Sequence, residues 1–359
     1  MAHRITLIPG DGIGPEVIEV ARRCVEATGV SVEWERRDMG AGAYSRTGDP
    51  LPVATLDSIR STQVALKGPI ETPVTSGLRS ANMTLRQGLD LYANVRPCRL
   101  YPGVPSLYDD VDIVVVRENT EGMYTGHEFE MGTPAVTELI RFIHDTTGRT
   151  VRPDSGISVK EISDSGSERV AEFAFRWAEE NGRTTVTAAH KANIMKFSDG
   201  LFLEVSRRVA ARHPSISFQD RIIDALSMQL IQLPERSDVL VMPNMYGDLV
   251  AELCAGLIGG TGVAPGGHFG DAAAVFEATH GTAPHLAGTD RANPVGAILS
   301  GVMMLHHLGE TEAAGRLDAA VAAVLAEGTS VTFDVRAPGD DRPAAGTYEV
   351  ADAVVERLR

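Results

Sequence analysis

A strand that is apolar along its whole length most restricts how this chain can fold. Residues 111–116 read VDIVVV, a nearly continuous apolar run of strand length. Such a run, unlike an alternating one, is typical of a strand covered by helices on both faces of its sheet. Further strands are predicted at residues 4–8, 30–35, 64–66, 185–189 and 239–242.

Amphipathic helical patterns lie between these strands. Strands that alternate with helices favour an α/β protein. The chain has 359 residues, enough for two or three domains' worth of core. Helices are predicted at residues 15–28, 167–181, 199–213, 248–258, 294–308 and 310–327.

Two stretches depart from this pattern. Residues 126–161 are polar apart from an apolar patch at 139–143, and we interpret them as an extension or a dimerisation arm. Residues 256–270 are rich in glycine, which indicates a tightly packed connector with few large side chains.

Charge and cysteine content exclude several classes of partner. The formal net charge is −15, so the chain repels nucleic acids and anionic membrane surfaces at long range. No apolar run approaches the length of a membrane span. The three cysteines are far apart and the first residues lack a signal-peptide pattern, which favours a reducing, cytoplasmic location.

Arginines give the first indication of chemistry. Arg117 directly follows the buried strand, and open α/β sheets bind ligands at the carboxyl ends of their strands. Arg86 and Arg96 lie in polar segments nearby in the sequence. A guanidinium binds carboxylates in bidentate fashion, although each arginine alone could equally form a structural ion pair.

Carboxylates give the second indication. Asp248 and Glu252 are spaced i, i+4, so they share one face of a helix and repel each other unless a cation lies between them. Oxygen ligands suit Mg²⁺ or Mn²⁺. The alternative is that acids in a first helical turn complement the helix dipole. Asp224 lies in an apolar stretch, where an acid requires a cation or a specific partner.

Lys191 and Tyr124 are candidate proton carriers, although each could equally be a surface or a packing residue. Lys191 directly follows a predicted strand, where neighbouring cations or burial would lower its pKa. The loop at residues 277–285 is built of small and polar residues whose backbone amides could hold phosphates. Residues 10–14 approach a dinucleotide fingerprint, but their third glycine comes one residue early, so a tight turn is the favoured interpretation.

Taken together, these segments resemble the β-hydroxyacid oxidative decarboxylases, the family of isocitrate, homoisocitrate and 3-isopropylmalate dehydrogenases. The matching segments span most of the chain and read IPGDGIGPEV, KGPIETP, RSANMTLRQGLDLYANVRP, VVVRENTEGMY, AAHKANIMK, PNMYGDLVAEL and EATHGTAPHLAG. The resemblance implies a large mixed sheet with helices on both faces, without a Rossmann domain. It also implies a cofactor-binding lobe (1–91 and 260–359), a dimerisation lobe (92–121 and 164–259) and a clasp arm (122–163).

The resemblance also assigns roles to individual residues. It implies a homodimer, or a higher oligomer, in which Lys191 and Asp224 reach the neighbour's site. The Asp224, Asp248 and Glu252 carboxylates would hold Mg²⁺ or Mn²⁺. The family usually has Asp at the position of Glu252, which would bind the metal directly or would contact a residue or water that does. Tyr124 and Lys191 would be the acid–base pair, and the arginines would hold substrate carboxylates. The NAD contacts would come from Thr72, Asn193, Glu277, His280, Gly281, Thr282, Ala283, His285, Leu286 and Asn293.

Substrate and cofactor choice follow from particular positions. Ser80 and Asn82 resemble the pair that grips the third carboxylate of isocitrate, whereas an isopropylmalate enzyme would be apolar there. Homoisocitrate, another tricarboxylate analogue or a 3-isopropylmalate-type substrate stays as the alternative, as does a catalytically silent regulatory subunit. His285 and Leu286 lack the groups that bind a 2′-phosphate, which favours NAD, although no acid is present to repel NADP.

Overall fold

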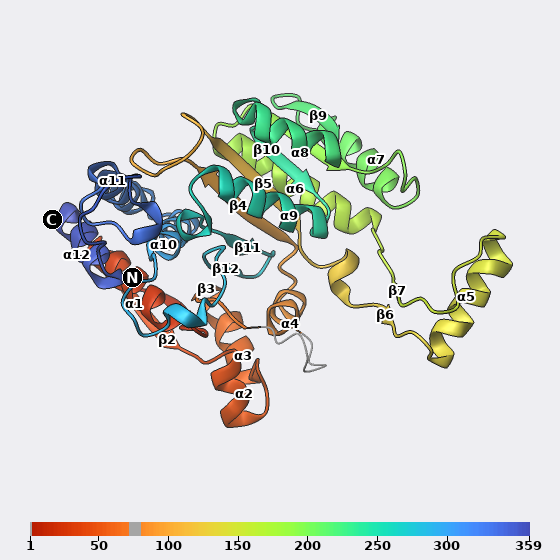
Figure 1. Ribbon diagram of the computed structural model, residues 1–359, viewed down its shortest axis with the longest axis horizontal. Coiled ribbons are helices and arrows are strands. Elements are labelled where there is room, and N and C mark those ends of the chain that lie inside the picture. The colour runs from red at the N-terminus through yellow and green to blue at the C-terminus, as the bar shows by residue number, and fades with distance from the viewer. Residues whose placement is uncertain (1, 72–79) are drawn as a thin grey trace.

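A ten-stranded mixed sheet organises the molecule (Figure 1). The computed structural model describes residues 2–71 and 80–359. The strand order is β2-β1-β3-β12-β11-β4-β5-β10-β8-β9, and β4 and β11 run antiparallel to their neighbours. The strands are β1 His3–Ile8, β2 Val32–Arg36, β3 Val64–Lys67, β4 Ala93–Arg99, β5 Asp112–Glu118, β8 Thr185–His190, β9 Ser217–Ile222, β10 Val239–Met242, β11 Gly267–Phe269 and β12 Ala274–Phe276.

The predicted double-sided strand is β5, near the centre of this sheet. It pairs with β4 on one side and with β10 on the other, and residues 113–116 have no exposed surface. The side chains of the two even-numbered residues point into one apolar core and those of the two odd-numbered residues into another. Both faces of the strand are therefore covered. The α/β class and the mixed sheet are therefore confirmed.

Helices cover both faces, and the six predicted ones are all present. Their ends differ from the prediction by up to four residues. The helices are α1 Gly14–Ala27, α2 Ala41–Thr47, α3 Val53–Thr62, α4 Ala81–Gly88, α5 Pro134–Thr147, α6 Asp164–Glu180, α7 Asp199–Ala210, α8 Ile223–Gln232, α9 Asn244–Leu257, α10 Val295–His307, α11 Thr311–Glu327 and α12 Thr347–Leu358. No helix in the described part of the chain combines the length and the apolar character needed to cross a membrane.

Two groups of helices lie at the two ends of the sheet (Figure 1). Helices α1, α10, α11 and α12 pack together at one end, and α6 and α7 pack together at the other. The division into two lobes at the stated residues stays a prediction.

The polar segment at residues 126–161 forms an arm that projects from the body (Figure 1). It holds a two-stranded sheet of β6 (Glu128–Phe129) and β7 (Ile157–Ser158), together with α5. The apolar patch at residues 139–143 is therefore one side of a helix, which the polar composition of its surroundings concealed. Within α5 only Val136 is buried.

Close backbone packing explains the glycines at residues 10–14. A Cβ atom on Gly12 would lie 1.9 Å from the carbonyl oxygen of Thr282, and Gly12 has a φ of +58°. The amide of Ile13 donates to the same oxygen at 2.9 Å. This loop is thus a tight turn packed against the loop that begins at residue 277, as the favoured interpretation predicts.

Candidate functional site

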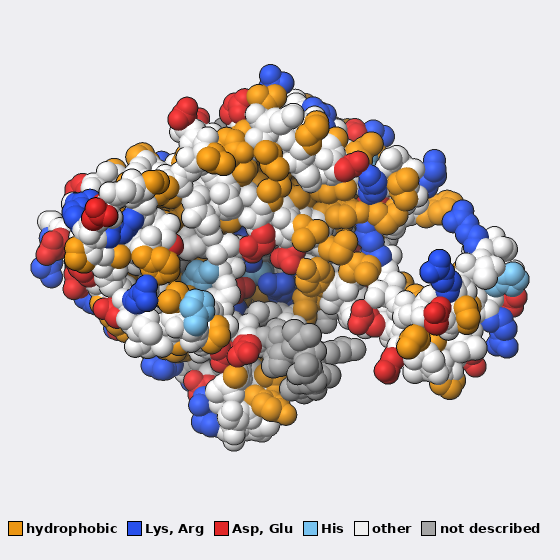
Figure 2. All heavy atoms as spheres, in the orientation of Figure 1, with side chains coloured by type: hydrophobic (Ala, Val, Ile, Leu, Met, Phe, Trp, Pro, Cys, Tyr) orange, Lys and Arg blue, Asp and Glu red, His pale blue; other side chains and the backbone are white. Residues whose placement is uncertain are grey.

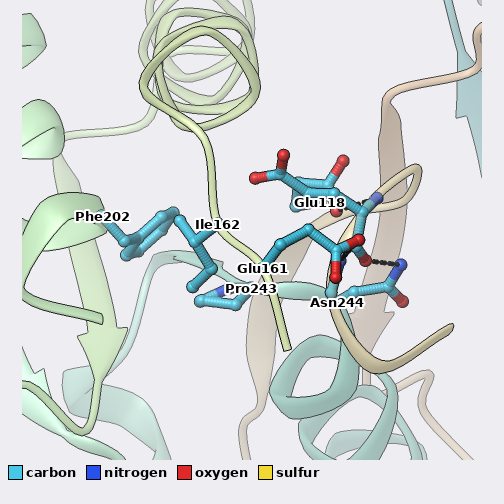
Figure 3. A pocket seen from close by; sticks show the side chains of 8 residues that line it. Glu118, Glu161, Ile162, Phe202, Pro243 and Asn244 are labelled. Atoms are coloured by element: carbon cyan, nitrogen blue, oxygen red, sulfur yellow. Dashed lines mark hydrogen bonds between the residues drawn. The ribbon is translucent and has the colours of Figure 1, made fainter. Parts of the chain in front are cut away.

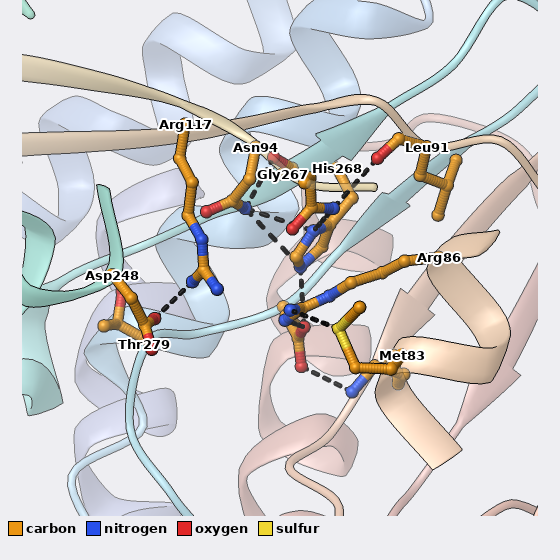
Figure 4. Close-up of polar contacts among 12 residues, drawn as sticks. Met83, Arg86, Leu91, Asn94, Arg117, Asp248, Gly267, His268 and Thr279 are labelled. Carbon is orange, nitrogen blue, oxygen red and sulfur yellow. Dashed lines mark hydrogen bonds and ion pairs between the residues drawn. The ribbon is translucent and has the colours of Figure 1, made fainter. Parts of the chain in front are cut away.

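Three arginines from separate elements meet near the middle of the sheet, and Figure 4 labels two of them, Arg86 and Arg117. Arg117 is the last residue but one of β5 and is 2% exposed. Its Nε and Nη2 both donate to the Asn244 side-chain oxygen, at 2.9 and 2.7 Å, and its Nη1 donates to Asp248. Arg117 is therefore held rigidly by the start of α9. Figure 2 shows basic and acidic side chains gathered in a hollow on this side of the molecule.

Arg96 and Arg86 are less completely paired. Arg96 donates from Nε to the side-chain oxygen of Asn94 at 2.9 Å, while its buried Nη1 has no partner among the described residues. Arg86 comes from α4, and its Nη2 lies 3.9 Å from a Glu277 oxygen. Burial, followed by repulsion from Arg117, lowers the pKa of Arg86 to about 10. Crowded, incompletely paired guanidiniums of this kind favour the binding of an anion.

Tyr124 lies beside Arg117, on a short 3₁₀ helix at Gly122–Thr125. Its hydroxyl donates to Asp248, and the Arg117 guanidinium lies 4.8 Å from the centre of its ring. Burial and the Asp248 carboxylate raise the pKa of Tyr124 to about 12, so the phenol is neutral near pH 7. Burial opposes ionisation of Asp248, but Arg117 and Tyr124 hold its pKa below the ordinary value.

A small cavity lies behind these residues (Figure 3). Glu118, Glu161 and Asn244 line it, and the Asn244 amide donates to the carbonyl oxygen of Glu121 at 3.0 Å. Glu118 accepts hydrogen bonds from Thr120 and from the backbone of Glu121. These bonds fix the turn between β5 and the short helix, which is the turn that positions Tyr124.

Ser80 and Asn82 lie at the start of α4, the helix that carries Arg86. The backbone oxygen of Ser80 accepts from the Thr84 amide at 3.0 Å, so Ser80 begins the helix. The side-chain oxygen of Asn82 is buried and has no hydrogen-bond partner among the described residues. The structure thus places an available polar atom close in sequence to the arginine.

Lys191 and Asp224 form a separate pair. Lys191 Nζ lies 2.8 Å from an Asp224 oxygen, and the backbone amide of Lys191 donates to Asp199 at 2.7 Å. The Asp224 side chain is 66% exposed, so its apolar flanks did not indicate burial. These flanking residues belong to the end of β9 and the first turn of α8, where the side chains point in different directions.

The carboxylates of α9 do not lie in its first turn. The helix begins at Asn244, so Asp248 and Glu252 occupy the second and third turns, and the helix-dipole alternative does not account for them. Burial raises the pKa of Glu252. In the described part of the chain, no three His, Cys, Asp or Glu side chains are grouped so that they could hold a metal ion. Asp224 is thus not brought to Asp248 and Glu252 within one chain.

The residues predicted to contact NAD lie mostly on one loop. His280 bonds its neighbour's carbonyl through Nδ1 at 3.0 Å, and its buried Nε2 has no partner among the described residues. Asn293 bonds Asp334 at 2.9 Å. Glu277 precedes the loop and is buried against the arginines. Gly281, Thr282, Ala283, His285 and Leu286 continue the loop. Asn193 is exposed near Lys191, and Thr72 lies outside the described residues.

Sequence reasoning missed four residues of the site. Lys67 is 1% exposed and bonds Glu277, and its signal was a lysine at the end of an apolar strand. His268 is the one ionisable side chain in the glycine-rich stretch at residues 256–270, and it bonds Glu277 at 2.7 Å. Asn94 and Asn244 support Arg96 and Arg117, which no pattern in the sequence indicates.

Comparisons with known proteins cover nearly the whole chain. The family model described as isocitrate/isopropylmalate dehydrogenase matches residues 4–354. A Caenorhabditis elegans protein, named as a probable mitochondrial alpha subunit of NAD isocitrate dehydrogenase, is 44% identical over 94% of this chain and 88% of its own. A Dictyostelium discoideum protein, named as a mitochondrial regulatory subunit of NAD isocitrate dehydrogenase, is 43% identical over 99% and 93%.

A solved structure gives the same result. The crystal structure of isocitrate dehydrogenase from Methylococcus capsulatus is 46% identical to this chain. It superposes with a TM-score of 0.90 and covers 99% of both chains.

The names of the two curated relatives contradict the cytoplasmic location predicted above, because both are named as mitochondrial. All three cysteines are free and buried. This indicates only that the chain needs no disulfide, which does not distinguish one reducing compartment from another.

Proposed function

Since the chain belongs to the isocitrate/isopropylmalate dehydrogenase family, we propose that it converts isocitrate to 2-oxoglutarate and CO₂ with reduction of NAD. The observation that carries this proposal is a group of three guanidiniums, Arg86, Arg96 and Arg117, which we call the arginine cluster. Arg96 and Arg117 are buried, and the Arg86 side chain is 11% exposed. The members of the cluster repel one another, and the buried Arg96 Nη1 has no partner among the described residues. A substrate with several carboxylates would relieve both conditions.

The chain's own side chains would orient the substrate. The arginine cluster would hold two carboxylates near Tyr124. Ser80 and Asn82 would hold the third. The Asn82 side-chain oxygen, which has no hydrogen-bond partner in the described part of the chain, supports this role. Because Arg117 is fixed by Asn244 and Asp248, its guanidinium is ordered before the substrate arrives, which reduces the entropy lost on binding.

Tyr124 suits the protonation step. Oxidation of the substrate hydroxyl gives a β-keto acid, and loss of CO₂ leaves a carbon that must take up a proton. A phenol with a pKa of about 12 is neutral at pH 7 and can donate that proton. Lys191, supplied by a second copy of the chain, would return the proton to Tyr124.

The carboxylates fit a divalent cation when two chains combine. Asp248 and Glu252 of one chain offer only oxygen atoms, the ligands that Mg²⁺ or Mn²⁺ prefer. Asp224 of a second chain would complete the set. A cation bound there would polarise the hydroxyl and carboxylate oxygens of the substrate.

The loop from Glu277 to Asn293 would hold NAD, which supplies the hydride acceptor. The buried, unpartnered His280 Nε2 supports this placement. His285 is exposed, and an acidic residue at this position would repel the 2′-phosphate of NADP. With histidine there, discrimination against NADP rests on the lack of cationic partners for that phosphate at His285 and Leu286.

A homodimer would bring the two halves of the site together. The Lys191–Asp224 pair lies among exposed apolar side chains, namely Ile194, Phe197, Met228, Ile231 and Leu249. We call this surface, formed by residues 191–197, α8 and α9, the lysine face. Figure 2 shows hydrophobic side chains gathered over α8 and α9. Apolar side chains grouped on a surface mark a site of association, and the arm would clasp the partner.

A substrate panel tests the proposal. Purified protein is assayed with isocitrate, homoisocitrate, 3-isopropylmalate and tartrate, each with NAD or NADP, with and without EDTA. We expect the highest kcat/KM with isocitrate and NAD, and loss of activity on chelation. Preference for homoisocitrate would assign a different substrate of the same family. A lack of turnover with any of these acids would contradict the proposed activity.

A regulatory subunit is the second candidate, favoured by the name of the Dictyostelium relative. Tyr124, Lys191, Asp224 and Asp248 are all present, which supports a catalytic chain. Light scattering combined with the isocitrate assay on the protein expressed alone distinguishes the two, because a catalytic homodimer turns over isocitrate without any other subunit.

A further inference from the structure

We propose that His268 is a positioning residue whose ring supports two arginines of the arginine cluster, Arg86 through Glu277 and Arg96 through Asn94. The inference rests on the proposed function, since the arginines matter as carboxylate ligands. His268 lies at the centre of β11 and is 1% exposed, so it cannot touch solvent (Figure 4). Its contacts connect the β4 strand to the end of β12.

The Nε2 atom faces a carboxylate. It lies 2.7 Å from Glu277 Oε1, and the other Glu277 oxygen accepts from Lys67. Although burial opposes it, Lys67 and His268 hold the pKa of Glu277 well below its ordinary value. An ionised carboxylate cannot donate a hydrogen bond, so Nε2 must carry the proton.

The Nδ1 atom faces an amide group, the side-chain nitrogen of Asn119, at 3.1 Å. The side-chain nitrogen of Asn94 lies over the ring, 3.2 Å from Nδ1 and 3.5 Å from Nε2. Both amides are oriented by other bonds, because Asn94 also donates to the carbonyl of Gly267 and Asn119 donates to that of Leu91. Nδ1 therefore accepts a hydrogen bond from Asn119 and carries no proton.

These contacts define one neutral tautomer, with hydrogen on Nε2. Protonation of Nδ1 would direct its N–H at the amide donor of Asn119. Arg86 and Arg96 add to the cost, because both cations face the ring, while Glu277 is the one charged group that would favour protonation. The ring thus keeps the same donor and the same acceptor whenever the protein is folded.

The ring leads to two arginines by different contacts. On the Nε2 side, Glu277 lies 3.9 Å from Arg86 Nη2 and balances its charge. Over the ring, Asn94, which also donates to the Gly267 carbonyl, presents its oxygen to Arg96 Nε at 2.9 Å, and Arg96 Nη1 keeps no partner among the described residues. A single imidazole therefore fixes how both guanidiniums face the substrate.

Two substitutions separate the nitrogens. The amide of His268→Gln reaches the place of Nε2 and can donate to Glu277, whereas the amide of His268→Asn reaches the place of Nδ1 and can accept from Asn119. Each keeps one contact and loses the other. We expect each to raise the KM for the best substrate of the panel by about tenfold, because each leaves buried polar groups unpaired, with kcat within about threefold. We expect His268→Ala to raise KM more than either of these substitutions.

The matched control is His213→Asn. His213 is also buried, stacks on Phe175 and has a carboxylate near each nitrogen, but it lies in the turn that follows α7, outside the site. It should lower the melting temperature without changing KM. Equal changes of KM in the control, or melting shifts without any KM change in the His268 variants, would show that His268 only maintains packing.

Nitrogen-15 NMR tests the tautomer independently of activity. Histidine-labelled protein should show one imidazole with protonated Nε2 that does not titrate between pH 8 and 5, and that signal should vanish in His268→Gln. A titrating ring, or one protonated at Nδ1, would overturn the inference. If the signal is as expected but no acid on the panel turns over, the proposed function fails and the tautomer assignment stands.

Discussion

The arginine cluster and the lysine face differ in burial, although both supply residues to the same proposed site. Arg117 is 2% exposed and its partners lie within the same chain, whereas the Asp224 side chain is 66% exposed and pairs with Lys191. A cluster of buried charges must be organised during folding, because unpaired charges there are costly. A solvated surface pair needs no such organisation before a second chain binds. This difference indicates that the arginine cluster is the preformed half of the proposed site.

Mixing two inactive variants gives the largest expected effect, and it tests whether the halves come from different chains. Tyr124→Phe removes the donor of the first half, and Lys191→Ala removes the base of the second. If copies share sites, a mixed dimer holds one intact site. Random pairing of equal amounts should then recover about a quarter of wild-type activity from two inactive preparations.

The control for that mixing is Tyr124→Phe with Arg117→Ala, both changes in the same half. No reassembled dimer from this pair has an intact site, so activity should stay near background. Recovery in the control, or none in the test pair after confirmed subunit exchange, would contradict shared sites.

Substitution of the buried Arg117 should lower the melting temperature more than substitution of the exposed Asp224. Arg117→Ala removes a substrate ligand and also leaves Asp248 and Asn244 without their main partner. We expect kcat/KM to fall by at least about a hundredfold. Asp224→Asn, measured for folding by thermal melting, should leave the melting temperature nearly unchanged, because exposed ion pairs contribute little. Equal melting shifts would refute the contrast in burial.

A charge placed on the lysine face should prevent association. Ile231→Asp puts a carboxylate on an exposed position of α8, and we expect a monomer in light scattering with an activity at least tenfold lower at dilute concentration. Val53→Asp is the control, since Val53 is also an exposed apolar residue but lies on α3. A stable, active Ile231→Asp dimer would place the interface elsewhere.

Acid should affect the arginine cluster before the lysine face. Burial and the neighbouring arginines lower the pKa of His268 to about 3, whereas the unfolded chain has a value near 6.5. Between these pH values the unfolded state binds a proton at His268 that the folded state does not bind. The contribution of the neutral ring to the free energy of unfolding is fully present above about pH 6.5. It is lost as the pH falls toward 3, by about 1.4 kcal/mol per pH unit. Urea melts of wild type and His268→Gln between pH 7 and 5 should show the shallower slope in the variant, and identical slopes would argue against a buried neutral ring.

The sequence predicted the features that depend on neighbouring residues. The VDIVVV run located the central strand, and Arg117 directly after it located the site, because a strand's end is fixed by its own residues. Contacts between distant segments were not predictable in this way. His268 acquires its role only when β11 inserts between β4 and β12, and Asp224 looked buried because its apolar neighbours are close in sequence but point elsewhere. The family resemblance supplied roles that spacing alone left open.

The arm has a thermodynamic consequence of its own. Helix α5 is 14 residues long and buries one side chain, Val136, and a helix of this length is marginal in water without tertiary contacts. In the proposed dimer, most of the free energy that keeps it helical would come from the partner chain. We expect its helicity to rise with protein concentration, so that dilution unfolds the arm first and assembly becomes the last step of folding for this part of the molecule.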